Sequence, residues 1–246
     1  MRDPAWVHAM RSSSPGSSVV ILLSGGLDST TLLSIYKAKG YAIFPISFEY
    51  GQTHLRELKS VEDLCSYYGV KGKRVKVEIP ESTSSLTGNA EIMARSLEEV
   101  GSGIPNTFVP SRNAIFLALA ASYAFSIGVD RIAIGVNSVD YSGYPDCRPE
   151  FISRMEETIN LALGKRDAIR IEAPLQYLSK GEIIRIGMAN HAPYDLTWSC
   201  YRGDQVSCGK CDSCLLRLRG FMDAGLQDPL EYSEYPDFYL ERKKKG

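Results

Sequence analysis

The 246-residue chain has 28 basic and 29 acidic side chains, which gives a net charge of −1. This balance argues against a broad electrostatic grip on nucleic acid or on an anionic membrane, so we expect neither partner. No apolar run approaches the length that spans a membrane, and residues 1–18 lack the apolar core of a signal peptide. We therefore expect a cytoplasmic protein with a flexible amino-terminal tail, in a compartment where disulfides are rare.

The first ordered feature is a strand, a tight turn and a helix. Residues 19–23 are consecutive apolar residues, which is typical of a strand buried on both faces. The polar stretch Ser24-Gly25-Gly26-Leu27-Asp28-Ser29-Thr30 follows, and residues 32–36 then begin the apolar face of a helix. Glycines let the backbone approach a ligand closely, and the amides of a helix start favour an anion. We interpret the stretch as a phosphate-binding loop. The alternative is a glycine turn that only joins the strand to the helix.

Strand and helix patterns continue to alternate along the chain. Strands are predicted at residues 41–48, 74–79, 131–135 and 168–172, and helices at residues 55–68, 112–127, 149–162, 183–190 and 212–224. This order predicts an α/β fold of the Rossmann-like, doubly wound type, with a mostly parallel five-stranded sheet. Pro45 predicts a bulge in the second strand. Ligands of such sheets bind at the carboxyl ends of the strands, so residues 24–30, 48–52 and 136–149 should surround one crevice.

Four cysteines lie close together near the carboxyl-terminal end. Cys200, Cys208, Cys211 and Cys214 form a C-x7-C-x2-C-x2-C pattern. Four thiolates at such spacing are typical of a tetrahedral zinc site, and a site with four protein ligands is closed, which favours a structural role for Zn²⁺. An iron–sulfur cluster and redox-active thiols remain alternatives. Cys147 receives no role from its sequence context.

These motifs resemble those of a known family. The stretch at residues 24–30 is similar to the Ser-Gly-Gly-x-Asp-Ser loop of the ATP pyrophosphatases, whose fold is of the adenine nucleotide alpha-hydrolase type. Over residues 19–232 the chain resembles the 7-cyano-7-deazaguanine synthase family of queuosine biosynthesis. The similarity rests on residues 24–30, Tyr50-Gly51-Gln52, Val109 to Asn113, Gly135 to Asn137, Asp140 to Phe151, Thr197 to Cys200 and Cys208 to Cys214.

The resemblance implies an ATP-dependent carbon–nitrogen ligase. Such an enzyme converts 7-carboxy-7-deazaguanine and ammonia to 7-cyano-7-deazaguanine, through an adenylated carboxylate and then an amide that is activated a second time. Mg²⁺ would accompany ATP, and one structural Zn²⁺ is expected per chain. We expect a tail at residues 1–18, a nucleotide-binding α/β domain at residues 19–195, and, at residues 196–246, the zinc-binding loop, a helix and a carboxyl-terminal tail packed on the same domain.

The resemblance also supplies candidate site residues. The catalytic candidates are Ser24, Asp28, Ser29 and Lys180, the last as a point charge near the phosphates. The ATP-binding candidates are Leu22, Leu23, Ser24, Gly25, Gly26, Leu27, Asp28, Ser29, Thr30, Glu49, Tyr50 and Gln52. The substrate-binding candidates are Arg112, Asn113, Asp140, Tyr141, Tyr144, Asp146 and Arg148. Tyrosine rings can stack on a planar base, aspartates accept from its N–H groups, and arginines hold a carboxylate. We therefore expect the segment at 136–149 to select the deazapurine; turn-stabilising aspartates and solvated cations are the competing interpretations.

Other functions remain open. A related enzyme would stop at the amide, 7-amido-7-deazaguanine. A tRNA-thiolating ATP pyrophosphatase would need a reactive cysteine near the phosphates and a basic RNA surface, which the net charge argues against. A zinc-ribbon nucleic-acid-binding module with a decayed nucleotide site is disfavoured by the intact Ser24, Asp28 and Ser29. No glutaminase segment fits the length, so the ammonia would be free or supplied by a partner, and a homodimer is an open alternative to a monomer.

Overall fold

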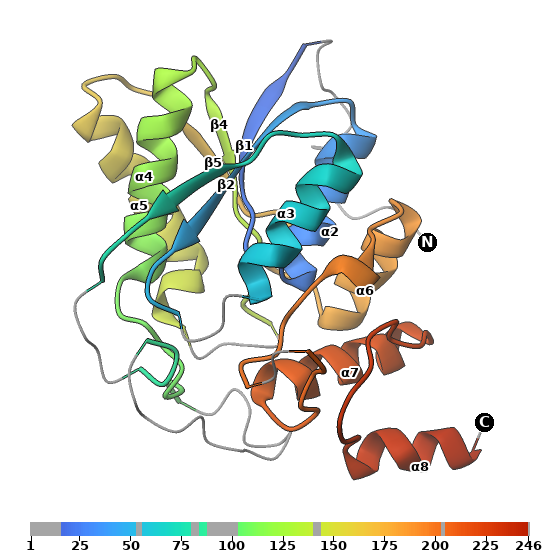
Figure 1. Ribbon diagram of the computed structural model, residues 1–246. Coiled ribbons are helices and arrows are strands. Elements are labelled where there is room, and N and C mark those ends of the chain that lie inside the picture. Colours follow the sequence, from blue (N-terminus) through green and yellow to red (C-terminus); the bar gives the residue numbers. More distant parts are fainter. Residues whose placement is uncertain are drawn as a thin grey trace.

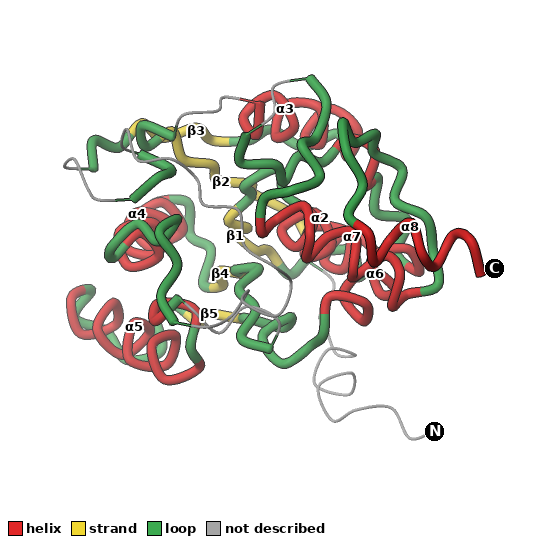
Figure 2. The backbone as a smooth tube through the Cα atoms, turned by 90° about the horizontal axis from the view of Figure 1, so that it is seen from below, coloured by secondary structure: helices red, strands yellow, loops and turns green. Residues whose placement is uncertain are grey.

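The computed structural model describes residues 16–52, 56–79, 84–87, 103–139, 144–202 and 205–245. At its centre is a sheet of five parallel strands in the order β3-β2-β1-β4-β5 (Figure 1, Figure 2). The strands are β1 (Ser18–Leu22), β2 (Ala42–Glu49), β3 (Lys73–Lys76), β4 (Arg131–Ala133) and β5 (Arg170–Glu172). Because β1 pairs with β2 on one side and β4 on the other, the strand order reverses at β1. The carboxyl end of β1 is therefore the point at which such sheets bind ligands.

Helices cover both faces of this sheet. The helices are α2 (Leu27–Ala38), α3 (Arg56–Tyr68), α4 (Arg112–Ser126), α5 (Pro149–Ala162), α6 (Lys180–Ala189), α7 (Asp212–Ala224) and α8 (Asp237–Lys245). Figure 2 shows α4 and α5 on one face and α2, α3 and α6 on the other. Helix α7 packs against α6, and α8 follows it at the lower edge of the view in Figure 1. The doubly wound α/β fold expected from the sequence is confirmed.

The side chains of β1 alternate between two apolar clusters. Val20 and Leu22 belong to the cluster that β1 shares with α4 and α5. Val19 and Ile21 belong to the cluster that it shares with α2, α3 and α6. Both faces of the strand are thus buried, which is the physical reason for its unbroken apolar run.

The bulge predicted at Pro45 is wrong. Strands β1 and β2 pair one to one through this residue. The carbonyl of Ile46 accepts a hydrogen bond from Leu23 next to β1, whereas the carbonyl of Glu49 accepts one from Val77 next to β3. Alternate residues of β2 therefore face opposite neighbours, and Pro45 faces the side on which pairing with β3 begins only at Ile46. The missing N–H lies where no β3 partner is paired, so the proline fits without a bulge.

The carboxyl-terminal tail expected from the sequence is partly helical. Helix α8 places Tyr239, which is buried, in a third apolar cluster with Trp198, Leu218 and Tyr232. The same cluster contains three of the four cysteines, so α8 helps to cover the cysteine-rich segment. Within the described ranges, no helix has both the length and the hydropathy needed to cross a membrane.

Candidate active site

The turn after β1 is closed by its own hydroxyl groups. Ser29 Oγ lies 3.1 Å from Ser24 Oγ, accepts a hydrogen bond from the Ser24 amide at 3.3 Å and donates to the Gly26 carbonyl at 3.1 Å. Ser24 Oγ accepts from the Gly26 amide at 3.3 Å. Gly26, the N-cap residue of α2, has no side chain with which to bond the amides of the first turn. The turn is therefore shaped like an anion site, with the partial positive charge of the helix start beside two hydroxyl groups.

Glycines lie at two points where other segments approach this turn closely. Gly25 has a φ of +84°, and a Cβ at this position would lie 2.5 Å from the carbonyl oxygen of Glu57. Gly135, after β4, lies against the turn from the other side, where a Cβ would be 3.2 Å from the Ser29 amide nitrogen. Both the conformation and the close packing exclude a larger residue at Gly25.

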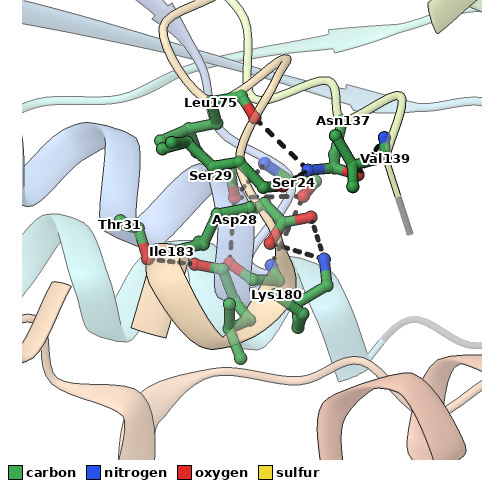
Figure 3. Close-up of polar contacts among 12 residues, drawn as sticks. Ser24, Asp28, Ser29, Thr31, Asn137, Val139, Leu175, Lys180 and Ile183 are labelled. Atoms are coloured by element: carbon green, nitrogen blue, oxygen red, sulfur yellow. Dashed lines mark hydrogen bonds and ion pairs between the residues drawn. The ribbon is translucent and has the colours of Figure 1, made fainter. Parts of the chain in front are cut away.

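Lys180 and Asp28 form an ion pair beside the turn. The Lys180 ammonium donates to both carboxylate oxygens of Asp28, at 2.8 and 2.7 Å, and Figure 3 shows the pair next to Ser24 and Ser29. Their side chains are only 15% and 25% exposed. The lysine opens α6, whose first turn is fixed by a capping box between Ser179 and Glu182. The structure thus brings the predicted lysine to the loop across 152 positions of sequence.

A cavity of about 320 Å³ opens at this edge of the sheet. The predicted residues that line it are Leu22, Leu23, Ser24, Gly26, Leu27, Asp28, Ser29, Tyr50, Gln52, Arg112, Asn113, Tyr144 and Lys180. The crevice expected from the three loops is therefore confirmed. The predicted residues Gly25, Thr30, Glu49, Asp146 and Arg148 are described but do not line the cavity, and Asp140 and Tyr141 lie outside the described residues.

Arg112 lies between two aromatic rings on one side of the cavity. Its guanidinium carbon is 5.8 Å from the ring centre of Tyr50 and 5.9 Å from that of Tyr144. The guanidinium also donates to the Tyr50 hydroxyl at 3.3 Å, and the Tyr144 hydroxyl shares a 2.8 Å hydrogen bond with Thr107. Both rings are buried, and their hydrogen bonds hold them in place. A cation framed by rigid aromatic rings suits a flat, anionic ligand.

Several predicted residues stabilise the surrounding loops. Gln52 accepts from the Tyr50 amide at 2.8 Å and donates to the Phe48 carbonyl at 3.3 Å. One carboxylate oxygen of Asp146 accepts from the Asn113 amide in the first turn of α4, at 3.0 Å. Loop stabilisation is the competing interpretation that the sequence left open for aspartates in this region.

Three further predicted residues lie away from the cavity. The Thr30 hydroxyl is buried and donates to the Gly26 carbonyl at 2.9 Å, within α2. Glu49 lies 3.7 Å from the ammonium of Lys76. Arg148 is exposed at the amino-terminal end of α5.

Several residues that line the cavity were not among the candidate site residues, although Asn137 and Cys147 lie in the segment at 136–149 that was expected at the crevice. They include Glu57, Asn137, Cys147, Trp198, Ser199 and Tyr201. The Cys147 thiol accepts from Asn113 Nδ2 at 3.5 Å, and burial raises its pKa to about 12. The thiol is therefore protonated at neutral pH. Burial also raises the pKa of the Glu57 carboxyl, to about 7, while the nearby Arg112 acts in the opposite direction.

The four predicted cysteine ligands come together. Their sulfur atoms all lie within 4.8 Å of one another, with 3.9 Å between Cys208 and Cys214 and 3.5 Å between Cys211 and Cys214. Zinc–sulfur bonds of about 2.3 Å in a tetrahedron require sulfur atoms about 3.8 Å apart. Backbone amides of Cys208 and of Lys210 donate to the sulfurs of Cys200 and Cys208, at 3.3 and 3.4 Å. The cluster therefore fits a metal ion held by four thiolates.

A buried ion pair ties this segment to the rest of the molecule. Arg217 of α7 donates to both carboxylate oxygens of Asp228, at 2.7 and 2.9 Å, with side chains 3% and 1% exposed. The same guanidinium donates to the Thr197 hydroxyl at 2.6 Å and to the Tyr194 carbonyl at 3.1 Å. Tyr232 adds a hydrogen bond to Asp228 at 2.6 Å. Because the polar groups of such a network are hydrogen-bonded to one another, it stabilises a single conformation of the cysteine-rich segment.

The sheet is parallel and doubly wound, and its Ser-Gly-Gly-x-Asp-Ser turn opens onto a cavity where the strand order reverses. These features define a nucleotide-binding α/β protein. The family model described as queuosine biosynthesis protein QueC matches residues 18–225, and the chain belongs to this family.

Curated relatives match this chain over nearly their whole lengths. A protein of Thermoplasma acidophilum named 7-cyano-7-deazaguanine synthase is 53% identical over 232 residues, which cover 92% of this chain and 98% of that protein. Proteins of the same name from Thermoplasma volcanium and Oceanobacillus iheyensis are 51% and 49% identical. These matches cover 92% and 88% of this chain, and 95% and 99% of the two relatives.

Proposed function

We propose that this chain is an ATP-dependent 7-cyano-7-deazaguanine synthase, which uses 7-carboxy-7-deazaguanine and ammonia. One observation carries the proposal beyond family membership. The anion-binding turn with Asp28 and Lys180, and the aromatic pocket around Arg112, line the same cavity. A triphosphate and a flat carboxylic acid can therefore bind beside each other, which an adenylation reaction requires.

The turn at Ser24 would stabilise the leaving pyrophosphate. When the substrate carboxylate attacks the α-phosphorus of ATP, negative charge grows on the departing phosphates. The hydroxyls of Ser24 and Ser29 and the start of α2 are fixed donors beside that charge, and the Lys180 ammonium, which is paired with Asp28, lies beside them. Mg²⁺ would bind with the triphosphate and neutralise part of its charge, and Asp28 is the carboxylate of the loop that would hold it.

The aromatic pocket would orient the acid. Tyr144 offers a buried ring to the planar deazapurine, and Arg112 offers its guanidinium to the carboxylate. Ammonia then displaces AMP from the adenylated acid and gives the amide. A second activation at the amide oxygen allows loss to the nitrile, so the same turn and pocket serve both rounds.

The four cysteines would hold one Zn²⁺ in a structural role. All four positions of a tetrahedral ion are taken by sulfur, so no site is left for water or substrate. The ion would join the loop around Cys200 and Cys208 to the start of α7, where Cys211 and Cys214 lie.

The chemistry of Cys147 disfavours the tRNA-thiolation alternative. Sulfur transfer needs a thiolate. Cys147 lines the cavity and lies outside the four-sulfur cluster, so it is the candidate for that thiolate. Burial holds its pKa at about 12, so it is not activated. Among the described residues, the other cysteine that lines the cavity is Cys200, which belongs to the four-sulfur cluster.

The test is a product assay combined with isotope exchange. Mass analysis of reactions with the deazapurine acid, ATP, Mg²⁺ and ammonium should show the nitrile; the amide alone would identify an amide-forming enzyme instead. Acid-dependent exchange of labelled pyrophosphate into ATP should fall by about a hundredfold or more in Ser24→Ala and Asp28→Asn, since each removes a group beside the developing charge. Near-normal exchange in both variants would refute the phosphate-binding role of the turn.

A further inference from the structure

Glu57 is an acid placed inside the cavity by the first turn of α3. It is partly buried and lines the cavity with Asp28, Tyr50 and Arg112. Its backbone is pressed against the anion-binding turn, because its carbonyl oxygen occupies the space that a Cβ on Gly25 would need. The position of Glu57 relative to the turn is therefore fixed by backbone packing.

The groups around Glu57 set its chemistry. Arg112 of α4 lies close enough to act on the carboxyl, and Tyr50, which follows β2, is bonded to the same guanidinium. Asp28 and Lys180 line the cavity as a pair, with the lysine bonded to both oxygens of that aspartate. Burial is the larger influence on Glu57 and raises the pKa of its carboxyl to about 7.

Two acids with different surroundings line the cavity. The residues that the structure describes around the cavity include two acids, Asp28 and Glu57, and no histidine. Asp28 is neutralised by Lys180 at the phosphate end. Glu57 lines the same cavity as Arg112, whose guanidinium would hold the substrate carboxylate. A base in this cavity would share it with the carbon that ammonia must attack.

We propose that the carboxylate of Glu57 binds the incoming ammonium ion and accepts its proton. The inference rests on the proposed function, since it names the group that prepares the nitrogen nucleophile. Ammonium has no lone pair, so it cannot attack until a base removes one proton. A carboxylate attracts the cation and, once partly desolvated, becomes basic enough to take that proton.

Ammonium transfers one proton to Glu57, and the freed nitrogen lone pair forms a bond to the acyl carbon of the adenylated acid. The bond from that carbon to the phosphate oxygen breaks, and AMP leaves with the electron pair. The nitrogen then loses a second proton to solvent, which leaves the neutral amide. Glu57 returns its proton to solvent before the next turnover.

The test compares two nucleophiles in Glu57→Gln. Ammonium needs a base, whereas hydroxylamine is largely neutral at neutral pH and already carries a lone pair. The variant should lose about a hundredfold or more in kcat/KM for ammonium. It should retain acid-dependent pyrophosphate exchange and hydroxamate formation from hydroxylamine within a few-fold of the wild type. Glu62→Gln is the matched control, because Glu62 lies on the same helix but is exposed and paired with Arg74.

Other outcomes would assign Glu57 a different role or refute the proposed function. Equal losses with both nucleophiles would make Glu57 a structural residue of the acyl site. Loss of pyrophosphate exchange in the variant would show that Glu57 acts in adenylation instead. Absence of acid-dependent exchange in the wild type would instead refute the proposed function. If Glu57→Gln does not fold, Glu57→Asp replaces it: a selective loss with ammonium supports the inference, and unchanged kinetics with both nucleophiles refute it.

Discussion

The backbone amide of Trp198 donates a 2.9 Å hydrogen bond to the carbonyl of Gly25. This bond joins the segment that leads into the cysteine cluster to the anion-binding turn. The Trp198 indole in turn donates to the Cys200 carbonyl at 3.0 Å, two residues further along. The ring also lies 5.4 Å from the guanidinium of Arg56 at the start of α3. The order of the cysteine cluster is therefore coupled to the shape of the turn.

Loss of the metal should weaken both stability and nucleotide use. We expect one zinc ion per chain, and we expect Cys208→Ser to lower the melting temperature and the rate of acid-dependent pyrophosphate exchange. The reason is that metal binding of this kind contributes directly to folding energy, and Trp198 transmits the disorder to Gly25. Elemental analysis, thermal melting and exchange assays measure the three quantities.

Cys65→Ser is the matched control for this prediction, because Cys65 lies on α3 outside the cluster. It should retain the metal and the exchange rate. If elemental analysis finds iron and the protein absorbs visible light, the four cysteines hold an iron–sulfur cluster and the zinc assignment is wrong. A Cys208→Ser protein with wild-type melting and exchange would show that the cluster has no structural role.

Gly220 should position Lys180. Helices α6 and α7 pack so closely that a Cβ on Gly220 would lie 2.3 Å from Lys180 Cγ and 2.9 Å from its Cβ. These atoms are near the backbone of the lysine and cannot swing aside as a side-chain tip would. Gly220→Ala should therefore displace the ammonium from Asp28 and lower kcat/KM for ATP by about tenfold or more.

A double-mutant cycle separates this effect from general damage to the helix interface. In a Lys180→Ala background, Gly220→Ala should have little further effect on ATP kinetics, because the displaced group is already gone. Gly181→Ala is the matched control, since its Cβ would meet Asp223 at 3.0 Å in the same interface. Additive losses for Gly220 and Lys180 would contradict the positioning role.

Tyr144 should contribute to binding of the acid more than to binding of ATP. Tyr144→Ala removes a buried ring beside Arg112, and loss of a stacking partner for a planar base costs about 1–3 kcal/mol. The KM for the deazapurine acid should rise by about tenfold while the KM for ATP changes little. Tyr144→Phe retains the ring but loses the hydrogen bond to Thr107, so it should stay near the wild type. Equal KM values for the deazapurine acid in all three proteins would show that its planar ring binds away from Tyr144.

Much of the fold could be predicted because its signals are local. The apolar run of β1, the capping box at Ser179 and Pro149 at the start of α5 each define an element from neighbouring residues. The bulge at Pro45 was predicted wrongly, because the tolerance of a proline depends on where the third strand begins to pair. Helix α8 was missed because Tyr239 is buried by the distant Trp198 and Leu218, contacts that a single segment does not reveal.

The same division applies to the site. The turn at Ser24 is contiguous, and its residues were found together. Lys180 was placed near the phosphates by resemblance, but its pairing with Asp28 was not predicted, because nothing in the sequence around Lys180 specifies the contact. Glu57 was missed because an acid in the first turn of a helix is expected for the helix dipole alone. Its role depends on burial beside Arg112, which only the tertiary structure supplies.

Glu57 should also make the stability of the protein depend on pH. Its pKa is raised from an ordinary 4.5 to about 7, so folding favours the protonated carboxyl. The stabilisation is fully present below the unfolded pKa and is lost as the pH rises through about 7. Glu57→Gln cannot ionise, so its melting temperature should exceed that of the wild type by several degrees above neutrality and converge with it below pH 4.5. Glu62→Gln, at an exposed position on the same helix, should show no such convergence. A difference between Glu57→Gln and wild type that stays constant from acid to alkaline pH would show that the Glu57 carboxyl has an ordinary pKa.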